Sequence, residues 1–130
     1  MPDALKSCIF CDYIINKNII IENQFAIAVY DNYPVNKGHT LIIPKRHFSS
    51  YFDATKNEIL ALNKLIIEVK ALLDDIYKPD GYNIGINIGE SAGQTIFHLH
   101  IHLIPRYFGD VENPRGGVRK LKKPLVEYDG

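Results

Sequence analysis

The sequence has no net charge, no long hydrophobic run and only two cysteines, and each shortage excludes a class of protein. Fifteen lysines and arginines balance fifteen aspartates and glutamates, so the overall charge does not indicate a nucleic-acid polymer as a partner. No apolar run reaches the roughly 20 residues that span a membrane, and residues 1–6 lack the apolar region of a signal peptide. We therefore expect a cytoplasmic protein that contacts no membrane. In that reducing compartment, two cysteines are not expected to form a structural disulfide.

The periodicity of the apolar residues predicts one α+β domain. Apolar and β-branched runs predict a hairpin over residues 19–30, a strand over 39–43 and another over 82–87. Residues 53–77 carry apolar side chains at helical spacing, and Thr55 with Glu58 forms a capping-box pattern near their start. Strands, one long helix and strands again predict an antiparallel sheet with the helix packed on one face.

Three of the five histidines, His98, His100 and His102, stand two residues apart between β-forming residues. Because side chains on a strand alternate between its two faces, we expect one strand that carries three imidazoles on the same face. Crowding three imidazoles together is costly unless they bind a metal or an anion. A structural histidine repeated by chance is the alternative, and the pattern favours a chemical site over it.

The loop 89–94 leads directly into the histidine run and contains small residues. Such residues let backbone N–H groups approach an anion closely, as in a phosphate-binding nest. A neutral imidazole in the middle of such a site can attack phosphorus and form a phosphohistidine that water cleaves later. No Walker-type loop is present, so the nucleotide chemistry of P-loop enzymes is not expected.

Cys8 and Cys11 form a CxxC pair, which suits either a redox motif or half of a zinc site. The redox hypothesis requires a helix that opens at the first cysteine inside a βαβ unit, and the sequence indicates neither. A structural zinc requires two further ligands, and His47 and His98 supply them if both reach the cysteine pair. We expect one structural zinc ion per chain, with free reduced thiols as the alternative.

The sequence beyond residue 110 loses its periodicity and becomes basic. We therefore divide the chain into a domain over residues 1–110 and a basic C-terminal tail over residues 111–130. The tail is either a solvated segment or one that reaches toward an anionic ligand at the site, and the sequence leaves both open. The basic residues of this tail are Arg115, Arg119, Lys120, Lys122 and Lys123.

Four segments together resemble the histidine triad (HIT) superfamily of nucleotide hydrolases and transferases. They are residues 8–11, 29–31, 38–48 and 94–102. The resemblance implies a HIT-like fold, in which one long helix packs on a half-barrel-like antiparallel sheet. The segment 104–110 is more similar to the prokaryotic and Fhit-like dinucleoside polyphosphate hydrolases than to the Hint phosphoramidases. His102 stands where the galactose-1-phosphate uridylyltransferases have glutamine.

The resemblance also implies roles for individual residues. His100 is implied to attack the α-phosphate of a nucleotide and form a nucleotidyl-histidine, while His102 and His39 bind the phosphoryl and leaving-group side. Asp31 is implied to bind the ribose hydroxyls; the alternative is a turn former only. Further substrate contacts implied are Asn87, Gln94 and Thr95 at the phosphates, and Ile9, Phe10, Val29 and Asn32 in the wall of the base pocket. In metal-containing relatives, the positions of Cys8, Cys11, His47 and His98 form a zinc site.

These implications predict a nucleotide hydrolase that acts on purine dinucleotides such as diadenosine tetraphosphate. The alternatives are an adenosine phosphoramidate hydrolase and a nucleotide-binding regulatory module. The presence of His100 favours an enzyme over the binding module, and the balanced charge disfavours oligonucleotide binding. Because the family is usually dimeric, the resemblance also implies a homodimer.

Overall fold

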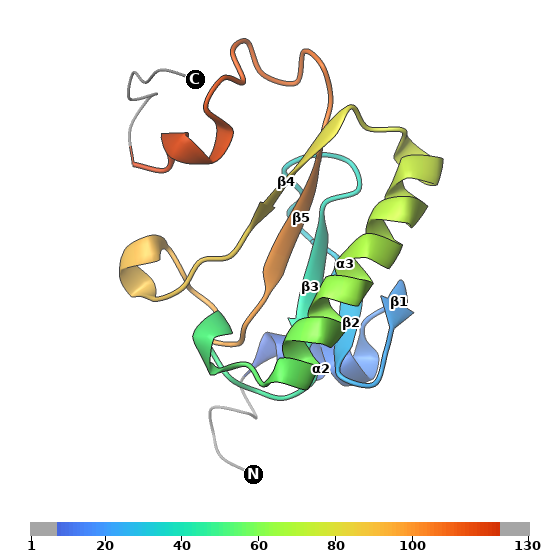
Figure 1. Ribbon diagram of the computed structural model, residues 1–130, viewed down its shortest axis with the longest axis vertical. Coiled ribbons are helices and arrows are strands. Elements are labelled where there is room, and N and C mark those ends of the chain that lie inside the picture. The colour runs from blue at the N-terminus through green and yellow to red at the C-terminus, as the bar shows by residue number, and fades with distance from the viewer. Residues whose placement is uncertain (1–7, 123–130) are drawn as a thin grey trace.

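The computed structural model describes residues 8–122, which form an open five-stranded sheet with a long helix along one face (Figure 1). The strand order is β1-β2-β3-β5-β4, and every neighbouring pair is antiparallel. The predicted α+β architecture is confirmed. The strands are β1 (Ile21–Glu22), β2 (Ala26–Tyr30), β3 (Thr40–Pro44), β4 (Gly81–Gly85) and β5 (Ile101–Arg106).

Two predicted regions extend beyond what the structure describes. Residues 1–7 of the expected domain and residues 123–130 of the expected tail, including Lys123, lie outside the described residues. Over residues 8–122, no helix combines the length and the apolar character that crossing a membrane requires.

Helix α3 (Lys56–Tyr77) is the long helix that covers the sheet. The Thr55 hydroxyl accepts from the backbone N–H of Glu58, and the Glu58 carboxylate accepts from that of Thr55, so the predicted capping box is present. The helix begins at Lys56 rather than at residue 53 because Tyr51–Asp53 forms a short 3-10 helix, η1. The buried residues between α3 and the sheet include Leu62, Leu65, Val69, Leu73, Ala26, Ala28, Ile42, Leu99, Ile101 and Leu103.

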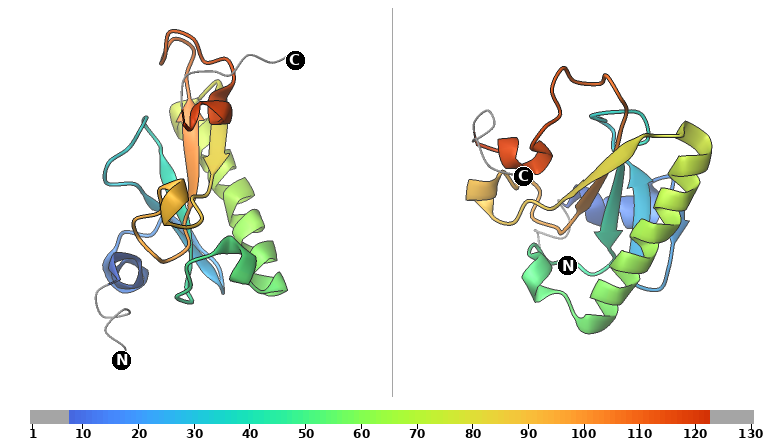
Figure 2. Two further views of the ribbon diagram at one scale, coloured as in Figure 1. Left: turned by 90° about the vertical axis from the view of Figure 1, so that its left-hand side faces the viewer. Right: turned by 45° about the horizontal axis from the view of Figure 1, so that its top comes forward.

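A second helix, α2 (Ile9–Asn16), packs on the opposite face of the sheet (Figure 2). Cys8 is its N-cap, and the Cys8 Sγ atom accepts from the backbone N–H of Cys11 at 3.3 Å. The expectation that no helix opens at the first cysteine is therefore wrong. Cysteine is not among the residues that usually cap a helix, so this start carried no ordinary signal. The buried residues of this smaller core are Cys8, Phe10, Ile27, Val29, Leu41 and Ile43.

The histidine run is not one continuous strand, which corrects a second expectation. Strand β5 begins only at Ile101, so His98 and His100 precede it in irregular backbone. Two hydrogen bonds hold this irregular segment in place of strand pairing. The backbone N–H of Leu99 donates to the Phe48 carbonyl at 2.6 Å, and the Pro44 carbonyl, at the end of β3, is bonded to the imidazole of His98. Strand β4 likewise ends at Gly85, opposite His102, short of the predicted residue 87.

The turn before β3 requires glycine at residue 38. Gly38 has a φ of +89°, a conformation that residues with a side chain rarely adopt. A Cβ atom there would also lie 3.0 Å from the Tyr77 ring and 3.1 Å from Pro105. The end of α3 and the end of β5 thus close tightly around the residue that precedes His39.

Candidate functional site

Four side chains converge beside the start of α2. The sulfur and nitrogen atoms of Cys8, Cys11, His47 and His98 all lie within 4.8 Å of one another. The Cys8 Sγ atom is 3.4 Å from Nδ1 of His98, and the Cys11 Sγ atom is 3.4 Å from Nδ1 of His47. In a tetrahedral zinc site with ligand bonds of about 2.0–2.3 Å, ligand atoms lie about 3.5 Å apart. The four groups therefore have the composition and dimensions of a Cys2His2 zinc site.

The hydrogen bond on the far side of His98 orients this imidazole toward the cysteines. Its Nε2 atom is 2.8 Å from the Pro44 carbonyl oxygen, which only accepts, so the ring hydrogen is on Nε2. The Nδ1 lone pair is then free to bind a metal. Burial lowers the pKa of His98 to about 4, which keeps the ring neutral at pH 7, and raises the pKa of the Cys11 thiol to about 11. A thiolate at Cys11 therefore requires a nearby cation, which zinc would provide.

A second group of imidazoles forms where β2, β3 and β5 lie side by side. His39 precedes β3, and His102 lies on β5 opposite Leu41. The backbone N–H of Val35 donates to Nδ1 of His39 at 3.0 Å, so the hydrogen of His39 is on Nε2. That Nε2 atom is 3.0 Å from Nδ1 of His102 and 3.4 Å from a carboxylate oxygen of Asp31. His39 therefore donates to His102, which leaves the hydrogen of His102 on its own Nε2 atom.

His100 has the opposite tautomer from its neighbours in the run. Its Nδ1 atom donates to the backbone carbonyl of His98 at 2.9 Å, which leaves a lone pair on Nε2. The ring centroids of His100 and His102 are 5.1 Å apart. Burial lowers the pKa of His100, and burial together with the neighbouring His100 and His39 lowers the pKa of His102 to about 4. Burial also lowers the pKa of His39. The three rings are thus neutral at pH 7, and His100 can act as a nucleophile without first losing a proton.

These imidazoles line a cleft of about 380 Å³. Asp31 plays a double part in it: one carboxylate oxygen accepts from the backbone N–H of Tyr33 at 2.8 Å, as in a turn, and the other faces His39. Both alternatives for Asp31 therefore have a structural basis. The predicted residues that line the cleft are Ile9, Phe10, Asp31, Asn32, His39, Asn87, Thr95, His100 and His102.

Two predicted substrate contacts do not line the cleft. Val29 is completely buried in the core under α2. Gln94 is buried, and its amide group is used within the chain. It accepts from the backbone N–H of Gly89 and donates to the carbonyls of Ser49 and Ile96. Gln94 thus holds the glycine-containing loop against the segment after β3.

Comparison with known proteins identifies the family of this chain. The family model of the HIT domain matches residues 14–109. The chain belongs to the HIT family. A HIT-like protein of Mycoplasma genitalium is 41% identical over 108 residues, which cover 81% of this chain and 77% of that protein. The recognition of the histidine triad superfamily from the sequence is confirmed.

Two further HIT relatives bear on the site. The crystal structure of a zinc-bound histidine triad protein from Mycobacterium smegmatis has a TM-score of 0.74 and 32% identity, and the match covers 82% of this chain and 79% of that one. An AP-4-A phosphorylase of Mycobacterium tuberculosis is 33% identical over 93 residues, which cover 71% of this chain and 48% of that protein. HIT proteins are nucleotide-processing enzymes, and the Cys/His cluster is compatible with zinc.

Several residues that line the HIT cleft were not expected. They are Tyr13, Tyr33, Val35, Leu41, Gly93 and Ile96. Tyr13 depends on α2, because the helix carries it one turn beyond Ile9 onto the same side. Recognition of a helix over residues 9–16 would have been the signal for it.

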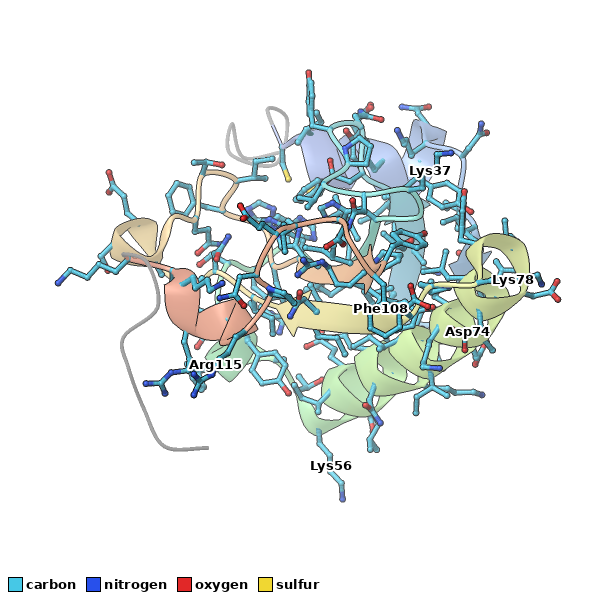
Figure 3. The ribbon with its side chains drawn as sticks, turned by 90° about the horizontal axis from the view of Figure 1, so that it is seen from above. Lys37, Lys56, Asp74, Lys78, Phe108 and Arg115 are labelled. Atoms are coloured by element: carbon cyan, nitrogen blue, oxygen red, sulfur yellow. The ribbon has the colours of Figure 1, made fainter. Side chains whose placement is uncertain are left out.

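The described part of the basic tail contributes apolar rather than basic side chains near the site. Residues 117–120 form the 3-10 helix η3. A second groove, of about 340 Å³, shares Val35, His39, Asn87 and His102 with the cleft. Its other lining residues are Asn83, Ile84, Gly85, Ile104, Arg106, Gly117, Val118 and Leu121. Figure 3 labels Phe108, in the loop after β5, and Arg115, in the segment that leads into η3. None of the described basic residues of the tail lines this groove.

Proposed function

We propose that the protein is a nucleotide hydrolase that cleaves purine dinucleotides such as diadenosine tetraphosphate at the α-phosphate through a nucleotidyl-His100 intermediate. The supporting observation is the tautomer of His100. Its Nδ1 hydrogen is held by the His98 carbonyl, so a neutral lone pair on Nε2 is available in the cleft. The AP-4-A phosphorylase among the relatives supports a substrate of this class.

The reaction proceeds in two displacements. In the first, Nε2 of His100 bonds to the α-phosphorus, and the bond from phosphorus to the leaving-group oxygen breaks with its electron pair. In the second, a water oxygen attacks the same phosphorus, the bond from phosphorus to His100 breaks, and the water releases a proton. His102, whose Nε2 hydrogen is oriented through His39, donates to the phosphoryl oxygens as they gain charge.

The remaining predicted contacts of the cleft are assigned by their chemistry. Asp31 accepts from the two ribose hydroxyls, while Ile9 and Phe10 supply an apolar wall for the base. Thr95 and Asn87 are polar groups on the phosphate side. Gln94 acts through its loop instead, because its amide is already bonded within the chain. Bound to Cys8, Cys11, His47 and His98, a zinc ion would hold α2 against the segment that carries His100 and would take no part in the reaction.

A trapping experiment tests the intermediate. The protein is mixed with diadenosine tetraphosphate labelled at the α-phosphates and quenched in alkali, where a phosphorus–nitrogen bond survives. We expect label on a peptide that contains His100 and none on the His100→Asn protein. Label that persists on His100→Asn would contradict the assignment. Turnover in water and in added inorganic phosphate separates a hydrolase from a phosphorylase.

The second groove favours the alternative function, that of an adenosine phosphoramidate hydrolase. Ile84, Ile104, Val118 and Leu121 give the groove beside His102 an apolar wall, which suits an uncharged organic amine. Its one cationic side chain, Arg106, is paired with Asp110 and therefore attracts a chain of phosphates less strongly. Comparing kcat/KM for diadenosine tetraphosphate and for an adenosine phosphoramidate of an apolar amine decides between the two substrates. A nucleotide-binding module without turnover is the outcome if neither is cleaved while both bind.

A further inference from the structure

Three polar side chains form a hydrogen-bonded chain at one end of the cleft. The ammonium group of Lys17 donates to the Oδ1 atom of Asn32, and the Nδ2 atom of Asn32 donates to the Tyr13 hydroxyl at 2.9 Å. The same ammonium group lies 5.0 Å from the centre of the Tyr13 ring. We call these three residues the amide relay. Tyr13 and Asn32 line the cleft, and Lys17 stands behind them.

The relay has a direction, because an ammonium group can only donate. The Asn32 carbonyl oxygen is therefore turned toward Lys17, and the amide nitrogen is turned toward Tyr13. The Tyr13 hydroxyl accepts this bond, so its own hydrogen remains to be donated. Burial, and after it the nearby Asp31 carboxylate, raises the pKa of Tyr13, which keeps the phenol protonated at neutral pH.

This direction decides what the cleft presents to a ligand. Tyr13 offers an O–H donor and Asn32 a second N–H donor, since only one amide hydrogen is used on Tyr13. The carboxylate that lines the cleft, that of Asp31, bonds the Tyr33 backbone N–H, faces His39 and is assigned to the ribose hydroxyls rather than to the base. The wall at Tyr13 and Asn32 is thus predominantly a donor surface, and it continues the apolar wall of Ile9 and Phe10.

We propose that the amide relay makes the cleft select 6-oxopurine nucleotides over 6-aminopurine nucleotides. The two classes differ at C6 and N1. On the edge that carries N7, a 6-oxopurine presents two acceptors, O6 and N7, whereas a 6-aminopurine presents one acceptor and an amino donor. Two donors facing that edge pair with both acceptors of the 6-oxopurine and oppose the amino group of the 6-aminopurine. A polar group left unpaired in a binding site strongly disfavours the wrong ligand. The proposal rests on the nucleotide site proposed above and ranks its purine substrates: the 6-oxopurine counterpart should bind more tightly than diadenosine tetraphosphate, which remains a substrate of lower affinity.

Binding of inosine 5′-monophosphate and adenosine 5′-monophosphate to the zinc-containing protein tests the proposal, because this pair differs only in the groups at C6 and N1. Calorimetric titration needs no turnover. We expect inosine monophosphate to bind about 10-fold more tightly, the effect of about one hydrogen bond and one avoided mismatch. In Asn32→Asp, Tyr13 donates to the new carboxylate and the relay presents acceptors, so the preference should shift toward adenosine monophosphate. Tyr13→Phe should lose most of the discrimination.

Asn18→Asp is the matched control, because it places the same new charge next to Lys17 in an exposed residue that does not line the cleft. It should keep the preference of the unaltered protein. Equal binding of the two nucleotides to the unaltered protein, or the same shift in both aspartate variants, would overturn the relay and leave the hydrolase proposal standing. Failure of both nucleotides to bind would overturn both proposals. Discrimination in binding without any hydrolysis would overturn only the hydrolase.

Discussion

The two imidazole clusters share one short stretch of chain, yet the two neighbouring rings of that stretch, His98 and His100, hold their hydrogens on opposite nitrogens. In the Cys/His cluster, Nε2 of His98 donates to the Pro44 carbonyl, and Nδ1 turns toward the cysteines. Two residues later, Nδ1 of His100 donates to the His98 carbonyl, and Nε2 is left with the lone pair. Both rings are buried and both have lowered pKa values. The difference lies in which nitrogen meets a backbone carbonyl, so backbone acceptors rather than residue type assign His98 and His100 to their different clusters.

Removing the nucleophile His100 is expected to have the largest effect on activity. His100→Ala should lower kcat by about four orders of magnitude or more, in the range found when a covalent nucleophile is removed. Zinc content and the free energy of unfolding should stay close to those of the unaltered protein. The measurements are single-turnover kinetics, elemental analysis and denaturant unfolding. Near-normal turnover in His100→Ala would remove the distinction between the two clusters.

Breaking the other cluster should affect stability instead of chemistry. Cys11→Ala should lower the free energy of unfolding by about 4 kcal/mol or more, because zinc binding contributes directly to folding. The protein that remains folded should still form the nucleotidyl-His100 intermediate. Purified, unchelated protein should contain one zinc per chain, and its absence in elemental analysis would contradict the metal assignment.

A substitution at Asp31 tests how the cleft binds the substrate. A carboxylate that accepts from two ribose hydroxyls makes charge-assisted bonds, so Asp31→Asn should raise KM for ribonucleotides by about one to two orders of magnitude. The loss should be smaller for the 2′-deoxy substrate, which lacks one hydroxyl. Steady-state kinetics with both substrates measures this gap. If it is the same in both proteins, Asp31 serves only the turn at Tyr33.

The smallest effect concerns how the metal cluster is anchored. The Arg46 side chain bonds the buried Glu58 carboxylate at 2.8 and 3.0 Å, which ties the segment before His47 to α3. Glu58→Gln should lower the free energy of unfolding at pH 7 by about 1 kcal/mol, because a neutral amide weakens the bonds to Arg46 and to the backbone N–H of Thr55. Turnover in the cleft should be unchanged.

The difference in the free energy of unfolding between the unaltered protein and Glu58→Gln should depend on pH in one direction. Hydrogen bonding to Arg46 holds the pKa of Glu58 below its ordinary value of 4.5. The stabilisation is therefore complete above that ordinary value and is lost as the pH falls through the lowered pKa. Denaturant unfolding of both proteins at pH 7 and pH 3 should show that their difference shrinks at pH 3. A difference that grows at pH 3 would contradict the pairing.

The sequence predicted the long helix and the strands because each has a local pattern. In the cysteine–histidine set only the CxxC pair is local; His47 and His98 were predicted as the missing ligands and by the family resemblance. The capping box at Thr55 and the apolar stripe of α3 depend only on neighbouring residues. The start of β5 at Ile101, after His98 and His100, could not be predicted. It depends on the carbonyls of Pro44 and Phe48, which are distant in sequence. Helix α2 was missed because a cysteine caps it, and with it Tyr13 was missed.

Other predictions concern properties that one described chain does not test. The homodimer and the cytoplasmic location stay predictions, as does the division of the chain into a domain over 1–110 and a tail over 111–130. Size-exclusion chromatography with light scattering measures the oligomeric state directly.

Gly38 constrains how this sequence can vary over evolutionary time. It has no functional group, yet any side chain there would meet Tyr77 and Pro105 and would also have to adopt a strained φ. Relief at Tyr77 alone would leave the contact with Pro105 and the strain. Accepting a larger residue therefore takes coordinated changes at residues 38, 77 and 105, which are distant in sequence. A position without a functional group is thus constrained by its backbone conformation and by the side chains packed around it.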